Sequence, residues 1–129
     1  MKTIEVVAAI IINNNKILCV QRGDNKREYI AFKYEFPGGK VEIGETREEA
    51  LVREIKEELG IEITILEEFL TVDHTYPDFN VIMHSFICGC ENSEVQLSEH
   101  VALQWLPKKE LFTLDWAAAD IPIVQKLQR

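Results

Sequence analysis

Runs and alternations of apolar residues predict most of the elements of this chain. Residues 4–12 are apolar apart from one glutamate and rich in Ile and Val, which is typical of a buried strand. Residues 13–15 are three asparagines and supply a turn, because Asn tolerates positive φ. Residues 16–21 then form the return strand of a hairpin. The polar stretch 22–34 is expected to be a loop, and residues 36–39 (Phe-Pro-Gly-Gly) a tight break in regular structure.

The clearest helix is predicted over residues 46–59. Thr46 stands at the N-cap and Glu49 follows three residues later, the spacing of a capping box. Gly60 follows the last periodic position, as expected of a glycine that ends a helix. This segment is therefore the element on which the functional interpretation rests.

The rest of the pattern predicts strands near 61–74, 80–89 and 100–106, a turn at 76–78, a short helix from Pro107 and a last helix near 120–128 with Pro122 in its first turn. Strands and helices are mixed without regular alternation, which favours an α+β sandwich over a doubly wound sheet. A chain of 129 residues with 47% apolar residues is expected to form one domain over 1–129 with a real core.

Composition narrows the classes of function. The net charge of −8 and the lack of a basic stripe argue against a nucleic-acid polymer as ligand, although a nucleotide stays possible because bound divalent cations invert local charge. No apolar stretch reaches membrane-spanning length. An odd number of cysteines, three, indicates no disulfide framework and fits a cytoplasmic location. Cys88 and Cys90 have no second pair to complete a zinc site.

Three carboxylates share one face of the predicted helix. Glu54, Glu57 and Glu58 are spaced i, i+3, i+4, beside an apolar face made by Leu51, Val52, Ile55 and Leu59. Ala50 falls within the acidic arc, where its small side chain is expected to leave room for a metal ion and a phosphate. Clustered carboxylates of this kind are natural ligands for Mg²⁺.

The alternative is a solvated amphipathic helix without a special role. That alternative predicts alternating Glu and Lys at i, i+4, whereas Glu54 and Glu58 are like charges at this spacing and destabilise an isolated helix by a few tenths of a kcal/mol. Arg53 and Lys56 lie outside the arc, so we expect the repulsion to be uncompensated. Such a local penalty favours a functional interpretation.

Residues 39–61 resemble the Nudix box at every defined position: Gly39, Glu45, Arg53-Glu54-Ile55, Glu57-Glu58 and Gly60-Ile61. The resemblance extends to the strand at 4–12, to the segment Glu35–Lys40 and to Asp120-Ile121-Pro122, which are similar to the MutT-type branch of bacterial CTP, modified-dCTP and 8-oxo-dGTP pyrophosphohydrolases.

The resemblance implies a mixed sheet sandwiched between helices and an Mg²⁺-dependent hydrolase, with Mn²⁺ as a substitute. Its reaction would convert a nucleoside triphosphate to the monophosphate and pyrophosphate, in nucleotide-pool sanitation and DNA repair or in pyrimidine homeostasis. The implied partner is a small nucleotide, with neither a nucleic-acid polymer nor a membrane, and the protein would be a monomer or a homodimer.

The resemblance also implies roles for individual residues. The implied metal ligands are Gly39, Glu54, Glu57, Glu58 and Glu99, and the implied catalytic residues are Arg53, Glu54, Glu57 and Glu99. Arg53 would orient a glutamate of the box. The general base stays open between Glu54, Glu57 and Glu99, and Glu99 is alternatively a solvated loop acid. His100 could titrate near neutrality or simply pack at a strand edge.

The expected substrate-binding residues are Arg22, Glu35, Phe79 and Asp120. Arg22 suits phosphate oxygens but could also be a solvated strand end. Phe79, like Trp105 and Trp116, offers a stacking surface or a core side chain. An ionised Asp120 accepts hydrogen bonds only, so it would favour the amine of a cytosine-type base over oxidised guanine. Its alternative role is to cap the last helix.

Three rival functions remain at this stage. The first is an 8-oxo-dGTP diphosphatase, or a hydrolase of a nucleotide sugar or dinucleotide. The second is a Nudix-fold module that binds nucleotides without cleaving them, although such modules usually lose the carboxylates that this chain keeps. The third is a structural protein with an acidic helix.

Overall fold

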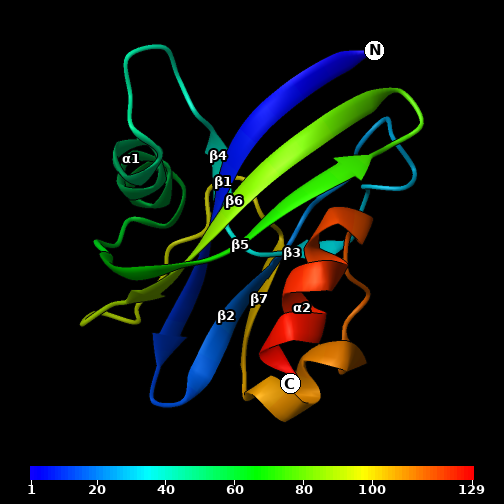
Figure 1. Ribbon diagram of the computed structural model, residues 1–129. Coiled ribbons are helices and arrows are strands. Elements are labelled where there is room, and N and C mark those ends of the chain that lie inside the picture. Colours follow the sequence, from blue (N-terminus) through cyan, green and yellow to red (C-terminus); the bar gives the residue numbers. More distant parts are fainter.

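The computed structural model describes residues 1–129 as a mixed β-sheet with helices on both faces (Figure 1). The strands are β1 (Lys2–Asn13), β2 (Lys16–Gln21), β3 (Tyr34–Glu35), β4 (Gly38–Lys40), β5 (Thr64–Thr75), β6 (Phe79–Gly89) and β7 (Ala102–Leu106). The helices are α1 (Arg47–Leu59) and α2 (Ile121–Leu127), with two 3₁₀ segments, η1 (Lys108–Thr113) and η2 (Ala118–Asp120). The expected α+β class is confirmed, and no helix is both long enough and apolar enough to cross a bilayer.

Strand β1 organises the sheet, whose main order is β3-β2-β1-β6-β5. It runs parallel to β6 along almost its whole length, and β6 pairs antiparallel with β5. On its other edge β1 pairs first with β4 and then, at its end, with β2, which in turn pairs with β7. The chain therefore leaves the middle of the sheet at β4 and enters α1 directly.

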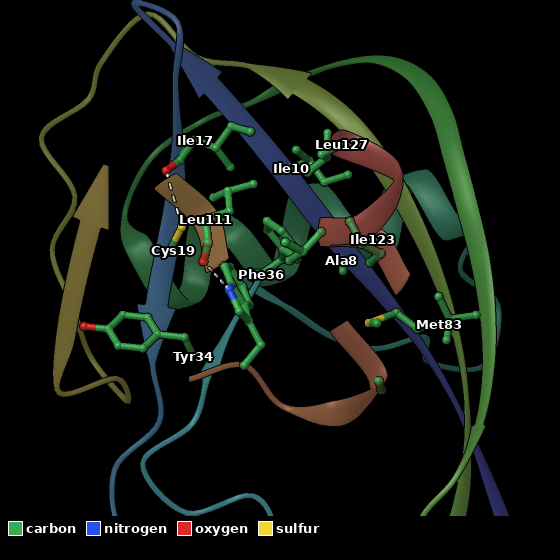
Figure 2. Close-up of a cluster of buried hydrophobic side chains, with 14 of the residues drawn as sticks. Ala8, Ile10, Ile17, Cys19, Tyr34, Phe36, Met83, Leu111, Ile123 and Leu127 are labelled. Atoms are coloured by element: carbon green, nitrogen blue, oxygen red, sulfur yellow. Dashed lines mark hydrogen bonds between the residues drawn. The ribbon is translucent and has the colours of Figure 1, made fainter. Parts of the chain in front are cut away.

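The long apolar run of β1 is explained by burial on both faces. Val7, Ala9 and Ile11 belong to the cluster under α1, whereas Ala8 and Ile10 belong to the cluster under α2 and η1. Figure 2 shows the second cluster, in which side chains of β1 and β2 meet those of α2. Two cores on one central strand fix the positions of α1 and α2 relative to the sheet.

Local signals in the sequence correspond closely to the observed elements. The first hairpin turns through Asn14 and Asn15, with φ of 51° and 62°. Helix α1 has the expected capping box: Glu49 N donates to Thr46 Oγ1 over 3.1 Å, and Thr46 N donates to Glu49 Oε1 over 2.9 Å. Gly60 ends the helix in the left-handed conformation at φ 70°.

The predicted break at residues 36–39 is confirmed for Phe36 and Pro37, which lie between β3 and β4, and wrong for the two glycines, because β4 begins at Gly38 and pairs with β1. A Cβ atom at Gly38 would lie 1.9 Å from the carbonyl oxygen of Val7. The glycine is thus there for a close approach between two strands rather than for a turn. The short strand β3 was also missed, and the strands predicted from residues 61 and 100 begin later, at Thr64 and Ala102.

Candidate active site

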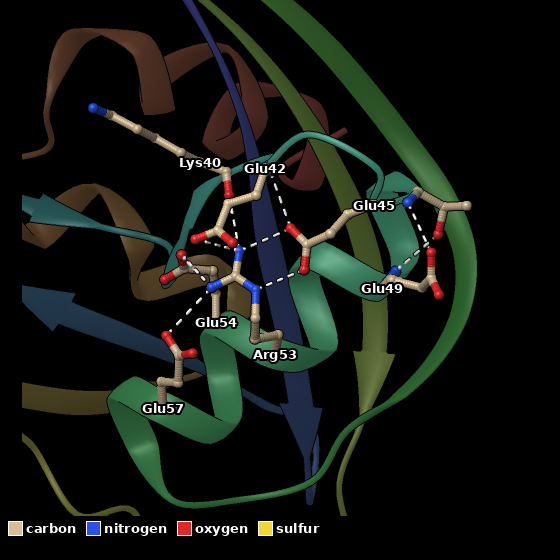
Figure 3. A network of polar contacts seen from close by, with 8 residues as sticks. Lys40, Glu42, Glu45, Glu49, Arg53, Glu54 and Glu57 are labelled. Atoms are coloured by element: carbon tan, nitrogen blue, oxygen red, sulfur yellow. Dashed lines mark hydrogen bonds and ion pairs between the residues drawn. The ribbon is translucent and has the colours of Figure 1, made fainter.

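Arg53 is the centre of the polar network on α1 (Figure 3). Its guanidinium donates two hydrogen bonds to Glu45, of 2.6 and 2.9 Å, one to Glu54 (3.0 Å) and one to Glu57 (3.3 Å). A fourth partner, the carbonyl oxygen of Lys40, ties the loop before the helix to the same group over 3.2 Å. Arg53 therefore fixes two of the predicted metal-binding carboxylates relative to the backbone of β4.

The electrostatics of this network differ from the expectation of uncompensated repulsion. Hydrogen bonds from Arg53 lower the pKa of Glu45, helped by the backbone N–H of Glu42, and hydrogen bonds to Glu45 and then Glu54 raise the pKa of Arg53. The expectation is wrong for Glu54 and Glu57, because the long guanidinium of Arg53 reaches around the helix to both, but the charge of Glu54 still raises the pKa of Glu58.

Two positions on α1 also differ from the helical-wheel prediction. Ala50 is fully buried in the core under the helix and leaves no space for a metal ion, whereas Val52, expected on the apolar face, is exposed. The remaining apolar residues, Leu51, Ile55 and Leu59, are buried as predicted. The buried face of α1 therefore includes Ala50 in place of Val52.

Gly39 lies directly against the carboxylate of Glu54. A Cβ atom at Gly39 would lie 2.3 Å from the Glu54 carboxyl carbon, so any larger residue would displace this carboxylate. The Gly39 backbone is paired with Val7 in the sheet and cannot easily yield. The first position of the motif therefore holds a carboxylate in place by leaving room for it.

Glu58 faces a second and separate environment. It lines a polar hollow of about 200 Å³ with Arg22, Glu35, Glu99 and His100, among others. Its Oε2 atom is buried and has no hydrogen-bond partner. Burial, and then the charges of Glu54, Glu99 and Glu35, raise the pKa of Glu58 from 4.5 to about 8. We call this region the acidic hollow.

The donors of the acidic hollow fit a hard divalent cation. Mg²⁺ and Mn²⁺ prefer carboxylate oxygens, and a cation would supply the partner that the buried Oε2 of Glu58 lacks. No three His, Cys, Asp or Glu side chains already surround one metal position. Glu54 and Glu57 point to Arg53, whereas Glu58 and Glu99 line the hollow, so the role of these four as ligands stays a prediction.

A mainly apolar hollow of about 280 Å³ adjoins the acidic one. Its lining includes Phe79, Tyr76 and Met83, with Asp120 as its buried acid, and Arg22 and Glu35 line both hollows. Tyr76 stacks on Phe79 with ring centroids 5.1 Å apart, which makes a flat aromatic wall. A nucleotide base would find an apolar surface here with few polar groups to orient it.

Asp120 is deeply buried and does not cap α2, because its side chain makes no capping hydrogen bond. Instead, its Oδ1 accepts a hydrogen bond of 3.0 Å from the backbone N–H of Phe36. Burial, and then the charge of Glu35, raise the pKa of Asp120 well above its usual range. The acceptor-only expectation applies to the ionised carboxylate, whereas the protonated form that burial favours has one O–H donor as well as an acceptor.

Arg22 and His100 hold Glu35 from two sides. Arg22 Nε donates to Glu35 Oε1 over 3.0 Å, and His100 Nε2 lies 2.9 Å from Glu35 Oε2. The His100 side chain is only 5% exposed, so it packs at the strand edge while contacting the site. Arg22 is half exposed and close enough to both hollows to meet a phosphate.

The aromatic residues divide clearly between core and site. Trp116 is buried, donates to the carbonyl oxygen of Leu111 over 2.7 Å and stacks on Phe36, so it is a core residue. Trp105 packs against the cluster under α1. Phe79 alone of the three stacking candidates lines the apolar hollow.

Comparison with known proteins supports the resemblance seen in the sequence. A NUDIX domain model matches residues 2–127. This chain belongs to the Nudix family. Within the family, α1 and the segment from β4 to the helix form the Nudix box, and Nudix hydrolases generally depend on a divalent metal.

Nudix proteins of the MutT type are similar to this chain over nearly its whole length. CTP pyrophosphohydrolase of Escherichia coli (strain K12) is 40% identical, covering 97% of this chain and 91% of that protein. 8-oxo-dGTP diphosphatase of the same strain is 33% identical, covering 100% and 99%. The solution structure of the DNA mismatch repair protein MutT from methicillin-resistant Staphylococcus aureus 252 is 40% identical, covers 99% and 98%, and has a TM-score of 0.76. This protein is therefore a Nudix hydrolase of the MutT type that acts on nucleotides.

Sequence reasoning missed two features of this Nudix site. Tyr76 was predicted only as part of a turn, yet it lines the apolar hollow and its hydroxyl accepts a hydrogen bond of 3.0 Å from Ala119 N. The contact between His100 and Glu35 joins residues 65 positions apart. An aromatic residue in an otherwise polar turn was the available signal for the first, and no local signal existed for the second.

Proposed function

We propose that this protein hydrolyses CTP, dCTP or a modified dCTP to the monophosphate and pyrophosphate, with Mg²⁺ as its metal and Mn²⁺ as a substitute. The observation that carries the proposal is the contact between the acidic and apolar hollows, which share Arg22 and Glu35. If the base binds in the apolar hollow, the triphosphate would lie over the carboxylates of the acidic hollow, because a single sugar joins the base to the phosphates and the two hollows adjoin.

The carboxylates and Arg53 would divide the chemistry between them. A bound divalent cation supplies charge neutralisation for the phosphates and acidifies water, and Glu54, Glu57, Glu58 and Glu99, with the carbonyl of Gly39, would hold it. One of Glu54, Glu57 and Glu99 accepts a proton from the water that attacks the β-phosphorus. The bond from this phosphorus to the bridging oxygen breaks, and the monophosphate leaves with the electron pair.

Arg53 contributes through position. Because it donates to Glu45, Glu54 and Glu57 at once, it keeps the acidic side chains in one arrangement before substrate arrives. Preorganised groups of this kind lower the barrier because they need no rearrangement during the reaction. Arg22 would meet a phosphate from the opposite side of the acidic hollow.

The base specificity depends on Asp120. A neutral carboxyl donates one hydrogen bond and accepts another, which matches the N3 acceptor and the N4 amine of cytosine. Because Oδ1 already accepts from Phe36 N, Oδ2 would carry the proton and donate to the base, while the second lone pair of Oδ1 would accept from the amine. The 40% identity to a CTP pyrophosphohydrolase supports the same choice.

A second candidate is hydrolysis of 8-oxo-dGTP. Oxidised guanine presents an O6 acceptor and an N7–H donor, which a neutral Asp120 also matches. The raised pKa of Asp120 thus removes the argument against this base that an ionised carboxylate would provide. The 33% identity to an 8-oxo-dGTP diphosphatase supports this candidate.

Steady-state kinetics with dCTP, 5-methyl-dCTP and 8-oxo-dGTP separate the two candidates, with monophosphate and pyrophosphate measured as products. We expect kcat/KM to be higher for the cytosine nucleotides, because the chain is more similar to the CTP pyrophosphohydrolase than to the 8-oxo-dGTP diphosphatase. The variant Asp120→Asn should retain this preference, because an amide offers the same donor and acceptor. A clear preference of the wild type for 8-oxo-dGTP would replace the first candidate by the second.

A further inference from the structure

His100 lies in the segment that leads into β7, and the backbone fixes it there. The neighbouring Val101 N donates to the carbonyl oxygen of Gln21 over 3.0 Å, at the end of β2. A Cβ atom at Gly23 would meet the Val101 side chain at 3.1 Å, so the two segments lie in close contact. The imidazole is therefore held beside the end of β2, next to Arg22, the residue that follows this strand.

The contacts of Glu35 come from opposite directions. Arg22 donates to one oxygen over 3.0 Å, and His100 Nε2 is 2.9 Å from the other. An ionised carboxylate can only accept, so Nε2 is the donor in this pair. With one donor on each oxygen, the plane of the carboxylate is fixed, and each oxygen still has a free lone pair.

The location of Glu35 indicates which part of a substrate it would meet. It lines both the acidic and the apolar hollow. A nucleotide with its base in one and its phosphates at the other would pass its sugar beside this carboxylate. A free lone pair on a carboxylate is a strong acceptor for a sugar hydroxyl.

His100 also has an unusual hydrogen-bond balance. Its Nδ1 atom is buried and has no partner, in a side chain that is 5% exposed. Glu58 Oε2, the other buried side-chain atom without a partner, belongs to the same hollow. Buried polar atoms are usually paired, and leaving one unpaired is unfavourable, so a histidine retained only for packing is a poor explanation here.

We propose that His100 is a positioning residue that orients the Glu35 carboxylate toward the 3′-hydroxyl of the substrate sugar. The inference rests on the proposed function, since it needs a nucleotide that spans the two hollows. It predicts that the effect of changing His100 depends on whether the substrate carries that hydroxyl. A histidine that only supports the fold would affect all nucleotides alike.

The test combines protein variants with paired substrates. For the wild type, His100→Gln and His100→Leu, kcat/KM is measured for each of the four 2′-deoxynucleoside triphosphates, for 8-oxo-dGTP and for their 2′,3′-dideoxy counterparts. Gln can donate from nearly the same place as Nε2, whereas Leu cannot donate. His84→Leu is the matched control, because His84 is also buried and lies 2.8 Å from a glutamate, Glu5, at a different hollow.

For the best deoxynucleotide, we expect His100→Leu to lower kcat/KM about tenfold or more, the value of a charge-assisted hydrogen bond. With its dideoxy counterpart the variant should be within about twofold of the wild type, and the wild type should itself lose about tenfold when the hydroxyl is removed. His100→Gln should recover most of the activity. His84→Leu should leave the ratio between paired substrates unchanged.

Equal losses for both substrates in His100→Leu would overturn the inference, as would a wild type that does not distinguish them. The second comparison needs no variant, so it can overturn the inference even if His100→Leu does not fold, and an unchanged substrate ratio in His100→Gln then supports the role of His100. A wild type that hydrolyses nucleotides with either of these results overturns only the role of His100. A wild type that hydrolyses none of them, and neither CTP nor 5-methyl-dCTP, overturns the proposed function, and the inference with it.

Discussion

Replacing Glu58 by Gln should stabilise the metal-free protein at neutral and alkaline pH. The pKa of Glu58 is raised from 4.5 to about 8, mainly by burial and then by neighbouring acids. Between these two values the folded chain holds a proton that the unfolded chain has released, so the free energy of unfolding falls as pH rises. Each pH unit in this window lowers the free energy of unfolding by about 1.4 kcal/mol, so the destabilisation by Glu58 at pH 7 has an upper limit of about 3 kcal/mol.

The measurable effect is smaller, because Glu58 is only partly buried and neighbouring acids share the response. We expect Glu58→Gln to raise the free energy of unfolding by about 1–2 kcal/mol at pH 8 and to change it little at pH 5. The assay is urea denaturation in the presence of EDTA at several pH values, with Glu57→Gln as a control because that acid is exposed. An identical pH dependence of wild type and Glu58→Gln would refute the reasoning.

Three further predictions follow from the same network. Arg53→Ala should lower kcat about 100-fold with little change in KM, because the substitution frees the carboxylates that Arg53 fixes in the wild type. Steady-state kinetics measures the effect, and an unchanged circular dichroism spectrum shows that the variant is folded. Gly39→Ala should cost most of the activity with little loss in urea denaturation, since the new methyl group displaces only the mobile carboxylate of Glu54; a fully active variant would contradict a role for this carboxylate position. Added Mg²⁺ should raise the Tm of the wild type more than that of Glu58→Gln, and equal shifts would place the metal elsewhere.

Local signals were sufficient for much of the fold. The capping box at Thr46 and the left-handed Gly60 depend on a few neighbouring residues, so the ends of α1 could be read from the chain. The Asn14–Asn15 turn is equally local. Gly38 is different: its role depends on Val7, a residue 31 positions away, so the two glycines of the Phe-Pro-Gly-Gly segment lie in a strand rather than in a turn.

The candidate site shows the same division. The positions of the box glutamates followed from spacing on one helix, but their partners did not, because Arg53 reaches across the helix surface to Glu45 and Lys40. The raised pKa of Asp120 follows from its burial and from the nearby charge of Glu35, which no sequence pattern states. Burial and long-range pairing are therefore what the structure adds.

The account depends most on the claim that the clustered carboxylates of α1 bind a divalent cation against a polyphosphate. A crystal grown with Mn²⁺ and a non-hydrolysable α,β-methylene analogue of dCTP tests this directly. The account predicts anomalous density for manganese among Glu54, Glu57, Glu58 and Glu99, with the base beside Asp120. Manganese and triphosphate bound elsewhere, with Glu54 and Glu57 still paired to Arg53 and no metal at Glu58 and Glu99, would contradict this claim.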